Sequence, residues 1–396
     1  MIVLAAHKQL EVLFISHNPS MSDCLETIYL AAKADPNCTA LWMPIPYYEL
    51  DSRTQTATMV YKGADEYDAS FDCVHWQTYD IKARHPDIIF TYNLYDDYNS
   101  ITSVHPTFYN KYLWEMTNSL IYVPYFVDLH TALYENMALM PGCIFTGKTI
   151  LATYEERNLY RKIFYRAYKN KFGLPKSKFV ALGSPKYDKV LQATRAQYEL
   201  PDQWQALIKD KKVITLISSV GSIMDFRIDY IIKLLRVFEL FQVRDDVVLW
   251  WRPHPLAEST FKSIVPALLP AYQRIVRKYK EANWGIYDDT PQLHRAIAYS
   301  DGYYGEWSSL LLMFQLIDKP VMLSSVTSKL DELKVGLKNC HYESDTDPLS
   351  SYIDNIVNNS ILLQGEKTTD NVVNADGTAG YKIYQYAKRT VLRRHV

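Results

Sequence analysis

The hydrophobic positions of this chain fall into short apolar runs separated by segments with helical spacing. In the first half, such runs lie at residues 11–17, 39–45, 87–91, 119–126, 143–145 and 179–182, and residues 23–33 carry one apolar helical face. In the second half, the runs lie at 212–218, 247–251, 284–287, 302–304 and 321–323, with helices expected near 225–240 and 380–393. Strands that are apolar on both faces and alternate with helices indicate parallel sheets covered on both sides.

This pattern stops and restarts once. Residues 192–210 are polar and show neither period, so we place a domain junction there. A chain of 396 residues also exceeds the size of one ordinary hydrophobic core. We therefore expect an α/β protein with two Rossmann-like domains, 1–198 and 199–396, facing each other across a cleft as in GT-B glycosyltransferases. The last helix, 380–393, is expected to pack back on the first domain.

Composition narrows the class of protein. Hydrophobic residues make up 48% and charged residues 22%, as in ordinary globular proteins, and the net charge of −1 gives no electrostatic case for nucleic acid. The five cysteines are scattered and show no CxxC spacing, which favours a reducing compartment over a zinc site or disulfides. No segment is apolar enough to be a signal peptide or to span a bilayer. We expect a cytoplasmic protein.

The most informative stretch is residues 299–320, which indicates a strand end, a polar turn and an apolar helix. The first N–H groups of such a helix point outward at its positive end, an arrangement that suits a phosphate. Ser308 and Ser309 at this turn can cap the helix or bind an anion, and one geometry serves both roles. Glu306 would repel phosphate, so it either hydrogen-bonds a hydroxyl or base edge, or faces away.

Other candidate residues follow other strands. The strand 247–251 ends in Arg252 and His254, and the flanking prolines fix the backbone there. This histidine can donate to a diphosphate or act as an acid near neutral pH; alternatively it bonds a backbone carbonyl in a turn. Ser218 and Ser219 follow the strand 212–218 in a loop that either approaches a phosphate or only starts a helix. All these groups fall where ligands bind in open α/β sheets.

Two histidines of the first half also follow predicted strands, and for each of them a structural and a functional role are both open. His130 follows the strand 119–126, and His17 follows the strand 11–17. Each is either a structural loop residue or a residue of the acceptor side. Acidic pairs occur at 96–97, 245–246 and 288–289, but they are more typical of solvated turns than of a metal site, so we expect no metal. The helix expected after residue 289 would leave His294 on the surface.

Residues 155–178 carry eight lysines and arginines among apolar side chains. A basic amphipathic helix of this kind is either the solvated crossover helix of a βαβ unit or a peripheral contact with the inner face of a membrane.

Several of these motifs resemble the CDP-glycerol glycerophosphotransferases of teichoic-acid synthesis. The similar segments are Arg-Pro-His-Pro at 252–255, Ser-Asp-Gly-Tyr-Tyr-Gly-Glu-Trp-Ser-Ser-Leu at 300–310, Asp-Lys-Pro at 318–320 and Gly-Ser-Pro-Lys-Tyr-Asp at 183–188. The sequence departs from the family at Thr131, where the family has glycine, and at 306–307, where Glu-Trp replaces Asp-Tyr. Residues 1–100 resemble nothing in it.

The resemblance implies a GT-B transferase that moves glycerol phosphate from a CDP-activated donor to an acceptor hydroxyl, without a cofactor. It implies that His254, Ser308 and Ser309 bind the donor diphosphate, with Arg252, Ser218, Ser219 and Glu306 beside them, and that His130 is the general base. The acceptor would be a polyol phosphate or glycan, in some cases lipid-linked. Two alternatives stay open: a nucleotide-sugar glycosyltransferase or epimerase of GT-B type, and a non-catalytic binding protein of a polysaccharide pathway.

Overall fold

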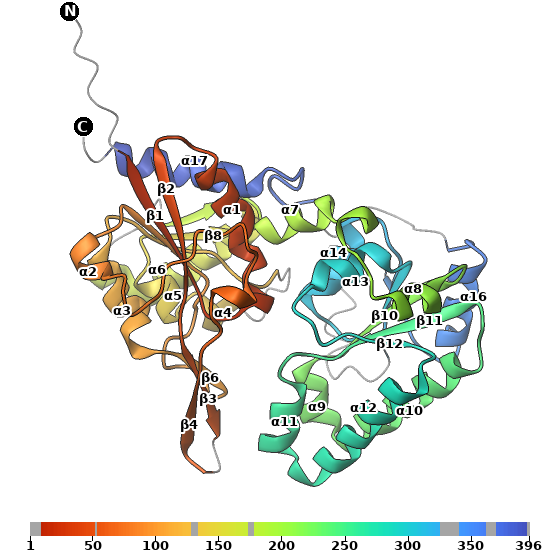
Figure 1. Ribbon diagram of the computed structural model, residues 1–396. Helices are drawn as coiled ribbons and strands as arrows, with labels where there is room; N and C mark the ends of the chain where they lie inside the picture. Colours follow the sequence, from red (N-terminus) through yellow and green to blue (C-terminus); the bar gives the residue numbers. More distant parts are fainter. Residues whose placement is uncertain are drawn as a thin grey trace, which may run out of the picture. The chain divides into compact units, whose positions relative to one another are not determined.

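The computed structural model describes residues 9–51, 54–127, 134–172, 178–324, 340–361 and 370–393. These residues form two compact units (Figure 1). Unit 1 comprises Met1–Lys189 and Asn371–Val396, and unit 2 comprises Val190–Asp370. The division thus falls between Lys189 and Val190, whereas the sequence analysis placed it between residues 198 and 199.

Unit 1 is built on a six-stranded parallel sheet with the order β2-β1-β5-β7-β8-β9. Its strands are β1 (Leu10–Ser16), β2 (Cys38–Pro44), β5 (Ile88–Thr91), β7 (Leu120–Tyr122), β8 (Lys148–Leu151) and β9 (Phe179–Ala181). Its helices are α1 (Asp23–Lys33), α2 (Ile81–Arg84), α3 (Asn110–Leu113), α4 (Tyr134–Met137), α5 (Pro141–Ile144), α6 (Tyr154–Phe172) and α17 (Ala379–Leu392), and α7 (Pro185–Gln192) begins in this unit.

Strand β1 shows why the runs are apolar throughout. Val12 and Phe14 pack with α1 and α17 on one face of the sheet, whereas Leu13 and Ile15 pack with residues of α2 and α3 on the other. Alternate side chains of a strand point to opposite faces, so a strand with helices on both sides needs apolar residues at every position. The prediction of a covered parallel sheet is confirmed.

Helix α17 returns to unit 1 and lies against α1 (Figure 1). Its Ile383, Tyr384, Ala387 and Val391 are fully buried in the same core as β1. Gly380 makes the close approach possible, because a Cβ there would lie 2.2 Å from the hydroxyl oxygen of Thr27 on α1.

Three further strands of unit 1 form a small antiparallel sheet that extends from the main sheet (Figure 1). They are β3 (Tyr47–Asp51), β4 (Thr56–Val60) and β6 (Thr102–Val104). The sequence pattern does not predict this sheet, because most of β4 is exposed and carries no apolar alternation.

Unit 2 repeats the architecture with a parallel sheet in the order β12-β11-β10-β13-β14-β15. Its strands are β10 (Lys212–Ile217), β11 (Val247–Arg252), β12 (Ile286–Tyr287), β13 (Gly302–Gly305), β14 (Val321–Leu323) and β15 (Cys340–Tyr342). Its helices are α8 (Asp202–Ile208), α9 (Val220–Phe226), α10 (Ile228–Gln242), α11 (Ala257–Ile264), α12 (Leu269–Ala282), α13 (Leu293–Tyr299), α14 (Ser309–Leu316) and α16 (Leu349–Val357).

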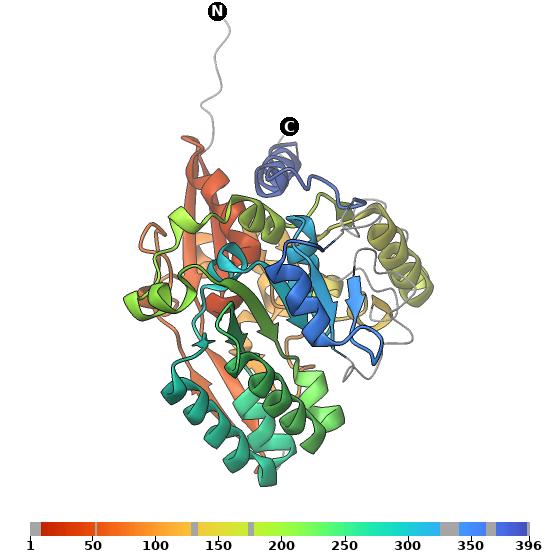
Figure 2. The ribbon, with the colours of Figure 1, turned by 90° about the vertical axis from the view of Figure 1, so that its right-hand side faces the viewer.

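One face of the unit 2 sheet is covered by α10, α11, α12 and α16, and the other by α8 and α13. Helices α10 and α12 lie side by side (Figures 1 and 2). The single helix expected near 225–240 is in fact two helices. They are separated at Arg227, whose φ of 48° no α-helix accommodates.

The strand expected at 143–145 is wrong. Residues 141–144 form the short helix α5, and the strand of this region is β8, a few residues later. Pro141 stands at the first helical position, where its fixed φ and missing N–H favour a helix start.

Candidate functional site

Strand β10 marks the point in unit 2 where the chain changes direction across the sheet. The chain runs from β10 to β11 and β12 on one side, then to β13, β14 and β15 on the other. In open α/β sheets, ligands bind at the carboxyl ends of the strands beside such a switch point. At this edge Ser219 follows β10, His254 follows β11 and Ser308 follows β13.

The register shows how near these groups are along the edge. Ile217, the last residue of β10, pairs with both Arg252 of β11 and Gly305 of β13. Adjacent strands lie about 4.8 Å apart, so residues just after β11 and β13 are separated by roughly 10 Å across the end of β10. One ligand of nucleotide size can therefore reach both sides of this edge.

Ser308 caps helix α14. Its hydroxyl oxygen accepts the N–H of Leu310 at 3.3 Å and lies 3.2 Å from the hydroxyl of Tyr303. The hydroxyl of Ser309, the first residue of the helix, has no hydrogen-bond partner among the described residues. The eight-residue helix thus begins at the sheet edge with a serine cap and a half-buried second hydroxyl.

Glu306 lies between these helix starts and faces the interior. It is 1% exposed, one carboxylate oxygen accepts the Nζ of Lys233 at 2.7 Å, and the other accepts the backbone N–H of Ser219. A carboxylate enclosed in this way does not reach a ligand, so the predicted binding role of Glu306 is corrected to a structural one. Its charge is also compensated before any phosphate approaches.

Lys233, the partner of Glu306, was missed by the sequence analysis. It lies on α10 and is 6% exposed, flanked by the buried Ile231 and Leu234 of the same helix. A lysine on the apolar face of a helix signals a buried ionic partner, because an unpaired buried charge is very costly.

Arg252 is also engaged by the protein itself. Its guanidinium donates to the carboxylate of Asp288 at 2.8 Å and to the carbonyl of Thr290 at 2.5 Å, and the residue is 8% exposed. These bonds join the ends of β11 and β12, and the expected contact of Arg252 with a phosphate stays a prediction. Asp288 is correspondingly 0% exposed, so this residue of the 288–289 pair does not lie in a solvated turn.

Two further sequence-based expectations about exposure are wrong. His294, expected on the surface, is 5% exposed on α13. Asp96, expected in a solvated turn, is 1% exposed and accepts N–H groups from Asn93 and Asn110. Burial raises the pKa of Asp96 to about 6.

The imidazole of His254 has a defined orientation and tautomer. Its Nδ1 accepts the N–H of Leu256 at 3.0 Å, so the neutral ring carries its proton on Nε2. Burial lowers the pKa of His254 to about 4, which makes the ring neutral near pH 7. It is therefore a hydrogen-bond donor at this edge, not the acid near neutral pH that the sequence suggested as one role.

Ser219 caps helix α9, with its hydroxyl accepting the N–H of Ser222 at 3.1 Å. Ser218 is 2% exposed and points into the protein, near the hydroxyl of Tyr230. The structure thus leaves His254 and the start of α14 as the groups of this edge that are best placed to meet a ligand.

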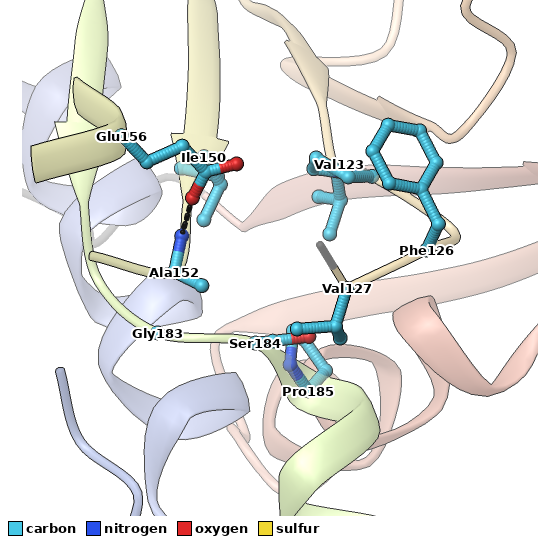
Figure 3. A pocket seen from close by; sticks show the side chains of 10 residues that line it. Val123, Phe126, Val127, Ile150, Ala152, Glu156, Gly183, Ser184 and Pro185 are labelled. Carbon is cyan, nitrogen blue, oxygen red and sulfur yellow. Dashed lines mark hydrogen bonds between the residues drawn. The ribbon is translucent and has the colours of Figure 1, made fainter. Parts of the chain in front are cut away.

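In unit 1, His130 lies outside the described residues. A small hollow at the carboxyl ends of β7, β8 and β9 is lined mainly by apolar side chains, with Gly183, Ser184 and Pro185 on one side (Figure 3). The carboxylate of Glu156 accepts the N–H of Ala152 at 2.8 Å, a bond drawn in Figure 3, and the hydroxyl of Thr153 caps α6 by accepting the N–H of Glu156 at 3.0 Å. The one carboxylate that lines this hollow is already hydrogen-bonded to the backbone, and most of the other lining side chains are apolar.

The remaining family-like segments have structural roles. In Gly-Ser-Pro-Lys-Tyr-Asp, the carboxylate of Asp188 accepts the backbone N–H groups of Ala379 and Gly380 and thus caps α17. In Asp-Lys-Pro, the ammonium of Lys319 donates to the carbonyl of Ile297 at 2.5 Å and so binds the end of α13.

The basic segment 155–178 corresponds largely to α6, and residues 173–177 lie outside the described part. The apolar side chains Tyr160, Ile163 and Phe164 are buried with Phe179 of β9. The face that would enter a membrane is therefore packed inside unit 1. Across the described ranges, no helix is both long and apolar enough to cross a bilayer, and no cluster of His, Cys, Asp and Glu could hold a metal ion.

The chain shares its fold with solved structures of very low sequence similarity. No protein-family model and no curated protein matches the sequence. A Staphylococcus aureus MnaA structure with UDP superposes with a TM-score of 0.57 at 12% identity, covering 96% of this chain and 97% of that one. The wall teichoic acid polymerase TagF gives 0.57 at 13% identity, with coverages of 98% and 90%.

A third similar structure is the UDP-GlcNAc 2-epimerase of Methanocaldococcus jannaschii in complex with UDP-GlcNAc and UDP. Its TM-score is 0.56 at 10% identity, covering 96% of this chain and 100% of that one. These proteins have the GT-B fold, and the likeness confirms the predicted fold class of two Rossmann-like units.

Proposed function

We propose that this chain is a GT-B transferase that uses a nucleotide-diphosphate donor, and that the donor is CDP-activated glycerol phosphate or a related polyol phosphate. The observation that carries the proposal is the carboxyl edge of unit 2, where the Nε2–H of His254 and the serine-capped start of α14 flank the end of β10. Both groups offer N–H or O–H donors, which suit a diphosphate.

The similar structures support the choice of a nucleotide ligand. The MnaA structure is a complex with UDP, the archaeal epimerase is in complex with UDP-GlcNAc and UDP, and one TagF structure was soaked with CDPG. The likeness to TagF, together with the motifs at 252–255 and 300–310, supports a polyol-phosphate donor for this chain.

In the proposed reaction, the oxygen of an acceptor hydroxyl attacks the β-phosphorus of the donor. A bond forms between that oxygen and phosphorus, the bond from phosphorus to the bridging oxygen breaks, and CMP leaves. The hydroxyl proton passes to a base, a role that the family resemblance gives to His130. His254 donates its Nε2–H to the phosphate charge, and loss of one such donor commonly costs about 3 kcal/mol of barrier.

A second function is favoured by the MnaA and archaeal epimerase structures, which cover nearly the whole chain. In this alternative, the same edge of unit 2 binds the diphosphate of a nucleotide sugar, and the reaction is sugar transfer or epimerisation. The two functions share the diphosphate site and differ in the group that the nucleotide carries.

Thermal-shift measurement with CDP-glycerol, CDP-ribitol, UDP-GlcNAc, CDP and UDP tests both. A ligand at a hundred times its dissociation constant stabilises the folded state by about 2.7 kcal/mol. We expect stabilisation by the CDP compounds, loss of it in His254→Ala, and retention in the control variant His341→Ala on β15. Stabilisation by UDP-GlcNAc alone would favour the second function. No nucleotide binding at all would leave a non-catalytic binding protein.

A further inference from the structure

Helix α10 of unit 2 is apolar on its outer face as well as on its inner face. Its inner face contributes buried side chains to the core of the unit. Its outer face carries Ile228, Ile232 and Leu235, which are 50%, 40% and 44% exposed. A surface helix normally turns polar side chains outward, and a continuous apolar patch on the surface marks a site of interaction.

The three residues form one stripe. Their separations of four and three residues place them on successive turns of one helix face, which is the spacing of the seam between two packed helices. On one flank the stripe adjoins a hollow between α10 and α12, two helices that lie side by side (Figures 1 and 2). This hollow is lined by Leu235, Phe238, Ile275, Tyr279 and Trp284, among others.

Two opposite charges lie beside the stripe, near its two ends. Asp229 and Arg236 are seven residues apart, so they lie on the same side of α10, two turns or about 10 Å apart along its axis. Neither lines the hollow, both are exposed, and neither forms an ion pair with another described residue.

This order of charges is complementary to itself. An antiparallel copy of the same helix, related by a two-fold axis near Ile232, runs the order in reverse. Asp229 of each helix then lies opposite Arg236 of the other, and the apolar stripes face each other between these two pairs. A parallel copy would place like charges opposite each other at both positions.

The charges around the stripe do not favour an anionic membrane as the occupant. Helix α12 carries several exposed lysines and arginines. However, Asp229 borders the stripe, and Glu239 and Glu281 line the hollow together with Lys278. These carboxylates would meet anionic headgroups, whereas a membrane-binding helix surrounds its apolar side chains with an excess of basic residues.

We propose that unit 2 pairs with a second copy of this chain through an antiparallel contact of α10 with α10, centred on Ile232. Two turns of one helix and their surroundings bury less than the about 1,600 Å² of a standard interface, so we expect a dimer that dissociates on dilution. The proposal does not depend on the proposed function, because no residue of the stripe belongs to the carboxyl edge of the sheet.

Sedimentation velocity of the full chain over a range of concentrations tests the contact. We expect a monomer–dimer equilibrium for the wild-type chain. In Ile232→Glu two carboxylates would face each other in the seam, so the dissociation constant of the dimer should rise at least about tenfold. The control is Leu30→Glu, which changes an aliphatic residue of α1 that is 46% exposed and should leave the dimer unchanged.

Charge reversal tests the antiparallel orientation. Asp229→Arg and Arg236→Asp each turn two attractive pairs into two like-charge pairs, so each should weaken the dimer several-fold. The double variant Asp229→Arg/Arg236→Asp should recover the wild-type dissociation constant, and the two single variants mixed in equal amounts should form a heterodimer. A loss of folding could not produce either recovery.

A wild-type chain that stays monomeric at every concentration, an Ile232→Glu dimer as tight as the wild type, or a double variant no tighter than the single ones would each overturn the proposal. Monomeric wild-type chain that sediments with phosphatidylglycerol vesicles, and loses this binding in Ile232→Glu, would overturn it in favour of a membrane contact.

Discussion

The ammonium of Lys233 and the carboxylate of Glu306 lie 2.7 Å apart in the interior of unit 2, and both residues are at most 6% exposed. Through the second oxygen of Glu306, which accepts the N–H of Ser219, this pair joins α10 to the starts of α9 and α14. The two loops of the switch point are therefore fixed by one buried carboxylate, and the ligand-facing groups are positioned by a residue that no ligand touches.

Removing one partner of this pair should be far more costly than removing both. Lys233→Met leaves an uncompensated buried carboxylate, for which we expect the free energy of unfolding to fall by about 3 to 5 kcal/mol. The double variant Lys233→Met/Glu306→Gln should recover much of this loss. Chemical denaturation measures both, with the exposed pair Lys280 and Asp289 as control, where Lys280→Met should cost under about 1 kcal/mol. Equal losses in the single and double variants would contradict this account.

Arg252→Ala separates a structural role from a phosphate-binding one. The buried Asp288 would lose its 2.8 Å partner, so we expect a loss of about 3 kcal/mol of unfolding free energy. The dissociation constant for CDP, measured by calorimetry on the folded fraction, should change less than threefold. A tenfold higher dissociation constant for CDP, with an unchanged free energy of unfolding, would instead support the contact between Arg252 and a phosphate that the sequence suggests.

The sequence predicts where the strands of the two parallel sheets lie, but it does not predict which way the polar side chains at the strand ends point. An apolar run of five or six residues between helices identifies a covered parallel strand from composition alone, as in β1, β10 and β11. Whether a polar residue at a strand end faces a ligand depends on partners distant in sequence, and periodicity carries no information about them. Glu306 faces Lys233, 73 residues away, and Arg252 faces Asp288, 36 residues away.

The strand-end histidines illustrate the same limit. The flanking prolines single out His254 in the sequence, but its neutral state follows from burial and from the N–H of Leu256, neither of which the motif reveals. His17 was noted only as one of two alternatives, because the phenol that fixes its backbone comes from Tyr92, 75 residues later. The antiparallel sheet is not predicted by the sequence pattern, since β4 is largely exposed and β6 has only three residues.

Both of these histidines should make the protein less stable in acid. Burial lowers the pKa of His17 and of His254 from 6.5 to about 4, so between these values the unfolded chain binds more protons than the folded one. The free energy of unfolding therefore falls as the pH falls from about 6.5 towards 4, by at most about 2 kcal/mol per histidine between pH 7 and pH 5. His17→Phe and His254→Phe should each reduce that difference in urea titrations at the two pH values.

Tyr47→Phe is the control for this measurement, because it alters the packing beside His17 without changing a group that titrates in this range. It should lower stability equally at pH 7 and pH 5. An undiminished difference between the two pH values in both histidine variants would show that neither ring is held neutral by burial.

The last prediction concerns the C-terminal helix α17, whose first turn is capped by a carboxylate of unit 1. Asp188 is 1% exposed and accepts the N–H groups of Ala379 and Gly380 together with the hydroxyl of Thr27. In Asp188→Ala the two buried N–H groups lose their acceptor, which costs about 1 to 3 kcal/mol each when they stay unsatisfied. Local opening of α17 becomes correspondingly easier, because a protein can release one element without unfolding the rest.

Limited trypsin digestion followed by intact mass measures this opening, since Lys382 and Lys388 lie within α17. We expect cleavage there to be about tenfold faster or more in Asp188→Ala, as 1.4 kcal/mol of opening free energy corresponds to a factor of ten when reclosing is fast. The control is Asp376→Ala, which removes an exposed carboxylate just before the same helix. If both variants are cleaved at the same rate, the capping bonds of Asp188 do not hold α17, and burial of Ile383, Tyr384 and Ala387 alone secures the segment.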